Sequence, residues 1–308
     1  MSLQSLVVNS EGTVLSFTDS GHPGSDSYTT VFAVHGIIFN GLIFKRVQAL
    51  SASSNIRFVA INRRRYAGST PYSDTESSIL MTGSDEEKAR WIDARGLELA
   101  NFVDTFIQDN QLPPISADGN SGGVALLGWS SGNQVTASAI ANLDKLSTSS
   151  QNRFTAYLRA YIMHEPPTII FGLPRTPKTR SPDIEETILA EKRTPMTMWL
   201  TSYFDHGDLS SRDPNILKHI VPSARRRPTI HDMTADEIAE IVDESFKLPS
   251  FPKLGDATGA LPLAAFFNIQ DDNAASGGNI KFVVIPGANH FFQWDDAKDA
   301  LKAYVEAL

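Results

Sequence analysis

The pentapeptide Gly128-Trp-Ser-Ser-Gly132 places Ser130 where a serine hydroxyl could act as a nucleophile. The apolar run Val124–Leu127 leads directly into it, and a segment rich in alanine and serine follows to about Leu146. This order predicts a strand, a sharp turn and a helix, an arrangement that exposes the serine hydroxyl above a sheet. The two glycines permit the close chain approach that such a turn requires.

A serine hydroxyl needs a base to take its proton, and His290 is the best placed of the seven histidines. It lies in Ile285-Pro-Gly-Ala-Asn-His-Phe-Phe292, after the last predicted strand and before the last predicted helix. Loops that follow parallel strands emerge at the carboxyl edge of the sheet, where Ser130 is also expected. Four other histidines lack this placement and are interpreted as structural or surface residues: His22, His206, His219 and His231.

Two backbone N–H groups are candidates for stabilising an oxyanion. His35-Gly36 ends the first central strand, so the N–H of the next residue, Ile37, is expected beside the Ser130 turn. The helix that begins after Ser130 offers the N–H of Ser131. Two such donors aimed at one oxygen form an oxyanion hole. His35 itself is predicted to pack within its loop.

Taken together, four segments resemble the α/β-hydrolase superfamily: His35-Gly36, Asn62-Arg-Arg-Arg-Tyr-Ala-Gly-Ser69, Gly128-Trp-Ser-Ser-Gly132 and Gly287-Ala-Asn-His290. The resemblance covers nearly the whole core. It implies an α/β fold, with a mostly parallel sheet, helices on both faces and an inserted helical cap. It also implies a serine nucleophile in a catalytic triad, and it is nearly silent on the substrate.

The third triad member departs from the usual pattern of that superfamily, in which an Asp follows the penultimate core strand. If residues 261–269 formed that strand, Asp271 or Asp272 would be the acid. Only residues 273–279 would then precede the strand predicted at Ile280, too few for a crossover helix. We therefore interpret this stretch as the crossover helix itself.

Glu165 offers a second place for the acid. It ends the strand predicted over Ala156–His164 and precedes Pro166-Pro167, which is similar to a variant pattern within the superfamily. The resemblance implies that Glu165 orients His290 and stabilises its imidazolium. The alternatives, in order, are Asp256, then Asp271 and Asp272.

The elements that position these residues alternate between strand and helix, which predicts a mostly parallel sheet. The predicted strands are two within residues 3–19, then 29–34, 56–61, 124–127, 156–164 and 280–285, and the predicted core helices span 86–107 and about 295–307. Prolines crowd residues 166–182, and helical stretches follow at about 184–203, 213–220 and 234–246. The predicted core is 1–165 and 261–308, and 166–260 form the cap.

Composition excludes several classes of protein. The 308 residues carry a formal net charge of -8, which disfavours nucleic acid and anionic membranes as partners. There are no cysteines, so disulfides and thiolate metal sites are excluded. We expect no metal and no cofactor, because the sequence has neither a cluster of metal ligands nor a glycine-rich phosphate loop. Two basic runs, Arg63–Arg65 and Arg225–Arg227, are typical of solvated faces, although either could bind an anionic substrate.

These features predict a cofactor-independent serine hydrolase that acts on an ester or lactone of a small, fairly apolar molecule. A thioesterase, an amidase or a carbon–carbon bond hydrolase would use the same residues, and a non-catalytic small-molecule receptor could use the same fold. The N-terminal residues lack the pattern of a secretory signal, and no apolar run reaches the length of a membrane span. We therefore expect a cytoplasmic protein.

Overall fold

The computed structural model describes residues 1–166, 194–208, 218, 221–243, 280–281 and 283–308. Within this part, one sheet has the strand order β1-β2-β4-β3-β5-β6. Its strands are β1 (Gln4–Val7), β2 (Val14–Asp19), β3 (Thr29–Val34), β4 (Ile56–Ile61), β5 (Val124–Trp129) and β6 (Leu158–His164). The pairs β1/β2 and β2/β4 are antiparallel, whereas β3/β4, β3/β5 and β5/β6 are parallel. The predicted mostly parallel sheet is confirmed.

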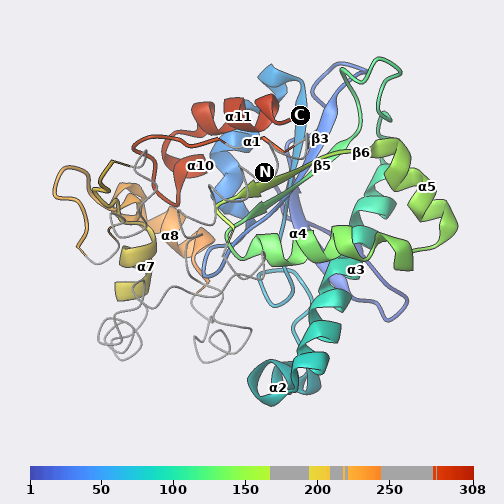
Figure 1. Cartoon of the computed structure of the whole chain (residues 1–308), viewed down its shortest axis with the longest axis horizontal. Coiled ribbons are helices and arrows are strands. Elements are labelled where there is room, and N and C mark those ends of the chain that lie inside the picture. Colours follow the sequence, from blue (N-terminus) through green and yellow to red (C-terminus); the bar gives the residue numbers. More distant parts are fainter. Residues whose placement is uncertain (167–193, 209–217, 219–220, 244–279, 282) are drawn as a thin grey trace.

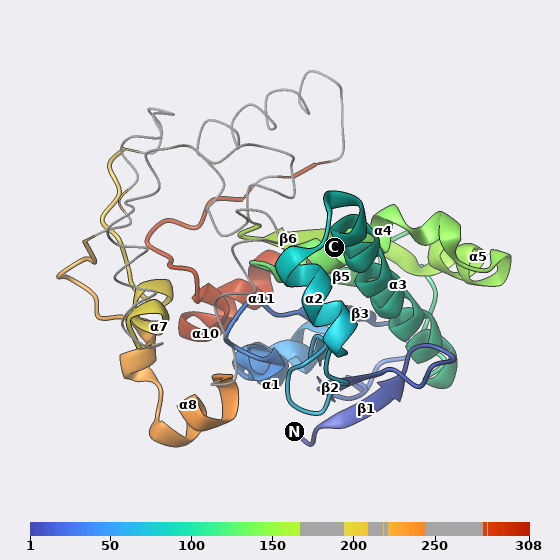
Figure 2. The ribbon, with the colours of Figure 1, turned by 90° about the horizontal axis from the view of Figure 1, so that it is seen from below.

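Helices cover both faces of the sheet (Figures 1 and 2). One face packs against α1 (Lys45–Ser51), α10 (Phe292–Asp295) and α11 (Ala297–Glu306). The other packs against α3 (Asp85–Asp109), α4 (Gly132–Ala141) and α5 (Thr148–Tyr157). The short helix α2 (Asp74–Thr82) precedes α3. These two apolar layers fix the sheet whose carboxyl edge carries the site.

The central strands match the sequence pattern closely because every residue of β3, β4 and β5 is buried. A strand covered on both faces is a continuous apolar run, so its limits are visible in the sequence. The predicted strands 29–34 and 56–61 agree with the structure residue for residue, while β5 extends to Trp129. The strand predicted over 156–164 begins at Leu158, because α5 extends to Tyr157.

The strand predicted over 280–285 is wrong for the described residues of that stretch. Residues 280, 281 and 283–285 are in no strand, and Ile280 and Val284 are 57% and 52% exposed. A run of β-branched apolar residues indicates only a local preference for extended backbone. A strand forms only when a neighbouring strand supplies hydrogen bonds to its backbone N–H and C=O groups. Among the described residues, β6 pairs with β5 alone and offers this segment no ladder.

The predicted cap, 166–260, lies largely outside the described residues and stays a prediction. Two of its helices are described in part as α7 (Thr194–Leu200) and α8 (Ala235–Ile241). The helix predicted over 213–220 lies outside the described residues except at 218. The chain after α8 contacts the loop that follows β3, because Val242 bridges to Phe39 and the N–H of Asn40 donates to the Ile241 carbonyl at 2.9 Å.

No helix in the described part of the chain combines the length and apolar character needed to cross a bilayer.

Candidate active site

Ser130 occupies the turn between β5 and α4 with a φ of 54°. A non-glycine residue in this left-handed region is strained, and such strain is concentrated at functional sites. The neighbouring glycines allow the turn to close. A Cβ on Gly132 would lie 2.2 Å from the Val34 carbonyl oxygen, and one on Gly128 would lie 2.5 Å from Thr136 Oγ1. The predicted strand, tight turn and helix around Ser130 are confirmed.

Ser130 and Glu165 lie side by side because their strands end in register. Trp129, the last residue of β5, pairs with His164, the last residue of β6. The N–H of Ser130 then donates to the His164 carbonyl at 2.9 Å. The side chain of buried Asn133 donates to the same carbonyl at 3.2 Å and to the Ser130 carbonyl at 2.9 Å. Glu165 follows with a φ of 45°, so both residues that leave the strands have strained backbones.

His290 reaches this edge from the loop before α10, and its Nδ1 makes a hydrogen bond with Glu165 Oε2. The indole of Trp129 fixes the histidine, since Nε1 donates to the His290 carbonyl at 2.9 Å and the two ring centroids are 5.0 Å apart. The histidine side chain is 22% exposed. The structure thus joins Glu165 to His290. It also joins His290 to Trp129, the residue directly before Ser130.

The electrostatic environment keeps Glu165 ionised. The Glu165 side chain is 48% exposed, and the partial loss of its contact with water would raise the pKa of the carboxyl. The adjacent imidazole of His290, through its charge and its hydrogen bond, outweighs this effect and holds that pKa below its usual range. His164 and His206 lower it further. A carboxylate on Nδ1 of a histidine leaves Nε2 free to accept a proton.

Among the described residues, no hydrogen bond joins the Ser130 hydroxyl to His290. Hydrogen bonds between catalytic groups are often long in the absence of substrate and tighten only in its complex. The alternative acids Asp256, Asp271 and Asp272 lie outside the described residues, as does His219.

The loop after β3 presents the Ile37 N–H in a strained setting. Ile38 has a φ of 67°, rare for a β-branched residue, and the N–H of Phe39 donates to the Ile37 carbonyl at 2.7 Å. The Tyr66 hydroxyl holds this turn by accepting from the Ile38 N–H at 3.1 Å. Among the described residues, the N–H groups of Ile37 and Ser131 have no acceptor. Both remain available to a ligand oxygen.

Gly36 lies directly against the Ser130 side chain, which gives a sharp test of the site. A Cβ on Gly36 would lie 2.9 Å from Ser130 Cβ and 3.3 Å from Ser130 Oγ. Gly36→Ala should therefore displace the hydroxyl and lower kcat by about 10²-fold, the usual cost of a misplacement of about 1 Å. Gly83→Ala is the matched control, because its Cβ would meet the Ile79 carbonyl oxygen at 2.7 Å, at the end of α2. Equal losses of activity in the two variants would contradict this geometry.

Two histidines near the site, the buried His35 and the partly buried His164, are held neutral. Burial lowers the pKa of His164 to about 4, with His290 contributing, and its Nδ1 lies 2.9 Å from the Tyr304 hydroxyl. Burial and Arg63 lower the pKa of His35 well below its usual value. The Nε2 of His35 accepts the Arg63 N–H at 3.1 Å, and its Nδ1 lies 2.8 Å from the Gly36 carbonyl oxygen. This agrees with the prediction that His35 packs within its loop.

These pKa values make stability depend on pH. The unfolded chain binds a proton at His164 below about pH 6.5, while the folded protein resists protonation down to about pH 4. Stability should therefore fall by about 2 kcal/mol between about pH 7.5 and about pH 5 on account of this one residue. Urea unfolding at both pH values measures this loss. In His164→Asn, the loss of unfolding free energy between the two pH values should be smaller by about 2 kcal/mol. A loss equal to that of the wild type would show that His164 is not its source.

Four contributors to the site were not predicted from the sequence. Trp129, Asn133, His164 and Tyr304 each hold a catalytic candidate or its strand end through the contacts above. Trp129 and Asn133 are close to Ser130 in the sequence, but nothing in that pattern indicates their partners. Tyr304 is one apolar position of the last helix, so the sequence carries no signal for its contact with His164.

No protein-family model matches the sequence, and no curated protein is significantly similar to it. Among solved structures, the chain is similar to a bromoperoxidase from Bacillus anthracis, with 15% identity, 99% of each chain covered and a TM-score of 0.53. It is also similar to an epoxide hydrolase variant from Vigna radiata, with 13% identity, 99% of this chain and 97% of that chain covered, and a TM-score of 0.53. An esterase from Exiguobacterium antarcticum has 14% identity, 97% and 98% coverage, and a TM-score of 0.51. At these identities the similarity establishes a shared fold.

Proposed function

Because the chain has the α/β-hydrolase fold, we propose that it is a serine hydrolase that cleaves an ester or lactone of a small, fairly apolar molecule. The observation that carries this proposal is the hydrogen bond between Glu165 and His290 at the sheet edge where Ser130 leaves β5. This hydrogen bond pairs a histidine base with a carboxylate, close to a serine in a tight turn between a strand and a helix. Nucleophilic acyl transfer requires this arrangement.

In the proposed reaction, Ser130 Oγ attacks the acyl carbon and its proton passes to Nε2 of His290. Glu165 holds Nδ1–H and stabilises the imidazolium, while the Ile37 and Ser131 N–H groups stabilise the oxyanion. The C–O bond of the substrate then breaks, and the leaving oxygen takes the proton from His290. Water attacks the acyl-enzyme and gives a proton to His290. The bond between the acyl carbon and Ser130 Oγ then breaks, and His290 returns that proton to Ser130 Oγ as the acid is released.

An apolar substrate is favoured by the apolar packing directly beneath these groups. Ile37 and Ile38 of the loop after β3 are 5% and 6% exposed, Trp129 is 1% exposed, and all three belong to the apolar core of the protein. Such a setting has a low local dielectric constant, which strengthens hydrogen bonds to an oxyanion. The esterase among the similar structures has the same fold, which is compatible with ester cleavage.

A panel of aryl and alkyl esters, lactones, thioesters, amides and β-diketones tests the proposal. We expect turnover to be greatest for short apolar esters or lactones, to be lost in Ser130→Ala, and to persist in Ser149→Ala. Ser149 is the control because it is an exposed serine of α5. Preference for thioesters, amides or β-diketones would change the substrate class while keeping the mechanism. Binding of these compounds without turnover of any of them would instead indicate a receptor.

A further inference from the structure

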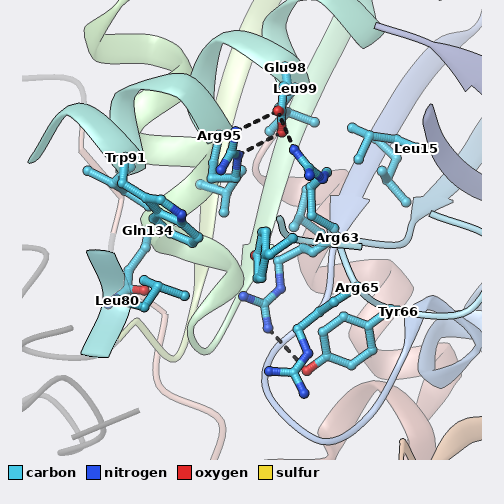
Figure 3. Close-up of a pocket in the computed structure, with 16 residues that line it drawn as sticks. Leu15, Arg63, Arg65, Tyr66, Leu80, Trp91, Arg95, Glu98, Leu99 and Gln134 are labelled. Carbon is cyan, nitrogen blue, oxygen red and sulfur yellow. Dashed lines mark hydrogen bonds and ion pairs between the residues drawn. The ribbon is translucent and has the colours of Figure 1, made fainter. Parts of the chain in front are cut away.

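A cavity of about 60 Å³ lies between α3, α4 and the loop that follows β4 (Figure 3). Trp91 of α3, Gln134 of α4 and the basic run Arg63–Arg65 line it. Ser130, Glu165 and His290 are not among its lining residues, so it is distinct from the candidate active site. A cavity needs about 10–15 Å³ to hold one water molecule, so this cavity has room for a group of several heavy atoms.

The basic run is not the solvated face that was expected, because Arg64 is 6% exposed and Arg63 and Arg65 are partly buried. Arg64 pairs with Glu76 and Glu98 at 3.0 Å each. Arg95, which also lines the cavity, pairs with the same two carboxylates at 2.8 and 2.7 Å. These two arginines and two glutamates therefore balance each other in charge. The second run, Arg225–Arg227, is exposed as expected.

Arg63 adds a positive charge that this network does not balance. Its guanidinium donates to the Gly36 carbonyl at 2.5 Å and lies over the Tyr66 ring, 5.3 Å from its centroid. No carboxylate of the described residues forms an ion pair with it. Its Nε is buried and has no hydrogen-bond partner in the described part of the chain.

A second buried donor lines the same cavity. Trp91 is 8% exposed, and its indole N–H has no acceptor among the described residues. An unpaired buried donor costs about 1–3 kcal/mol, and an unpaired charge costs more. The Arg63 Nε–H and the Trp91 indole N–H thus both belong to residues that line one cavity, and both lack an acceptor within the described residues. Because one of them belongs to a cationic side chain, the acceptor that would satisfy them is expected to carry negative charge.

We propose that this cavity binds a small oxyanion, a carboxylate or phosphate group, between the Arg63 guanidinium and the Trp91 indole. A guanidinium matches the two oxygens of either group, and the indole N–H supplies a further donor. The site does not depend on the proposed hydrolase activity. Through its bond to the Gly36 carbonyl, Arg63 links this site to the loop that carries the Ile37 N–H.

Indole N–H signals in NMR spectra of the ¹⁵N-labelled full chain test the proposal. The chain has four tryptophans, and the Trp91 signal is the one that disappears in Trp91→Phe. Titration with sodium acetate or sodium phosphate should shift the Trp91 signal saturably, while sodium chloride at matched ionic strength should not. Tighter binding of acetate indicates an organic carboxylate as the natural ligand, and tighter binding of phosphate indicates a phosphate group.

Arg63→Gln should raise the Kd of the better anion by at least about tenfold, as expected for loss of a charged donor. Arg225→Gln, on the exposed run, should leave that Kd unchanged. If Arg63→Gln fails to fold, Trp91→Phe is the second variant, because it removes the indole N–H but keeps the charge of Arg63. We expect Trp91→Phe to raise the Kd about three- to tenfold, measured by anion-dependent thermal stabilisation. Trp199→Phe is its control. A Trp91 signal unmoved by both anions, or a Kd unchanged in the variants, would overturn the proposal.

Discussion

Ser130→Ala should lower kcat by about 10⁴–10⁶-fold, because the serine, the histidine and the carboxylate act as one unit. The fold should persist, since alanine removes only a hydroxyl that has no hydrogen bond to His290 among the described residues. The melting temperature and the kcat of the variant with the best ester from the panel measure both effects. A variant that keeps more than about a tenth of the activity would show that the nucleophile is another group.

Glu165→Gln should lower kcat by about 10²–10⁴-fold. Glutamine keeps the size of the side chain but removes the charge that stabilises the imidazolium of His290. The lowered pKa of the Glu165 carboxyl has the same physical cause, namely the attraction between carboxylate and imidazole. Steady-state kinetics of the variant, together with its melting temperature, separate loss of catalysis from loss of fold.

The aspartates that the sequence left as alternatives provide the controls for this prediction. Asp256→Asn, Asp271→Asn and Asp272→Asn should each lower kcat by less than about tenfold. A loss of about 10²-fold or more at one of them, with Glu165→Gln near wild type, would assign the acid to that aspartate. That result would leave the roles of Ser130 and His290 unchanged.

The parts of the fold that sequence predicts best are those with one dominant physical cause. The strands β3, β4 and β5 are buried throughout, so their apolar runs show where they begin and end. The helix α3 was predicted over 86–107 and spans Asp85–Asp109, because one apolar side faces the sheet. Elements of this kind need no knowledge of their partners.

Elements that depend on partners or on weak local signals were missed. The helix α5 was not predicted, since its sequence is rich in serine and threonine and its apolar periodicity is poor. The helix α2 was missed although Ser73 and Glu76 form a capping box that the sequence contains. The strand predicted over 280–285 is wrong for the opposite reason. Its residues strongly prefer extended backbone, but no strand among the described residues pairs with them.

The candidate site was predictable where topology fixed it. Strand ends in a parallel sheet share one edge, which places Glu165 beside Ser130 once β5 and β6 pair. The contacts that hold the site, such as Trp129 on the His290 carbonyl, depend on side-chain packing over 161 residues of separation. No periodicity or motif encodes a contact of that kind.

Labelling with a fluorophosphonate followed by peptide mapping is the decisive test of Ser130 as the nucleophile, because only an activated serine attacks the phosphorus at a useful rate. We expect one adduct, located on Ser130, with labelling slowed strongly in Glu165→Gln and in His290→Ala. An adduct on another residue, or no adduct in a folded wild-type protein, would contradict the assignment of Ser130 as the nucleophile.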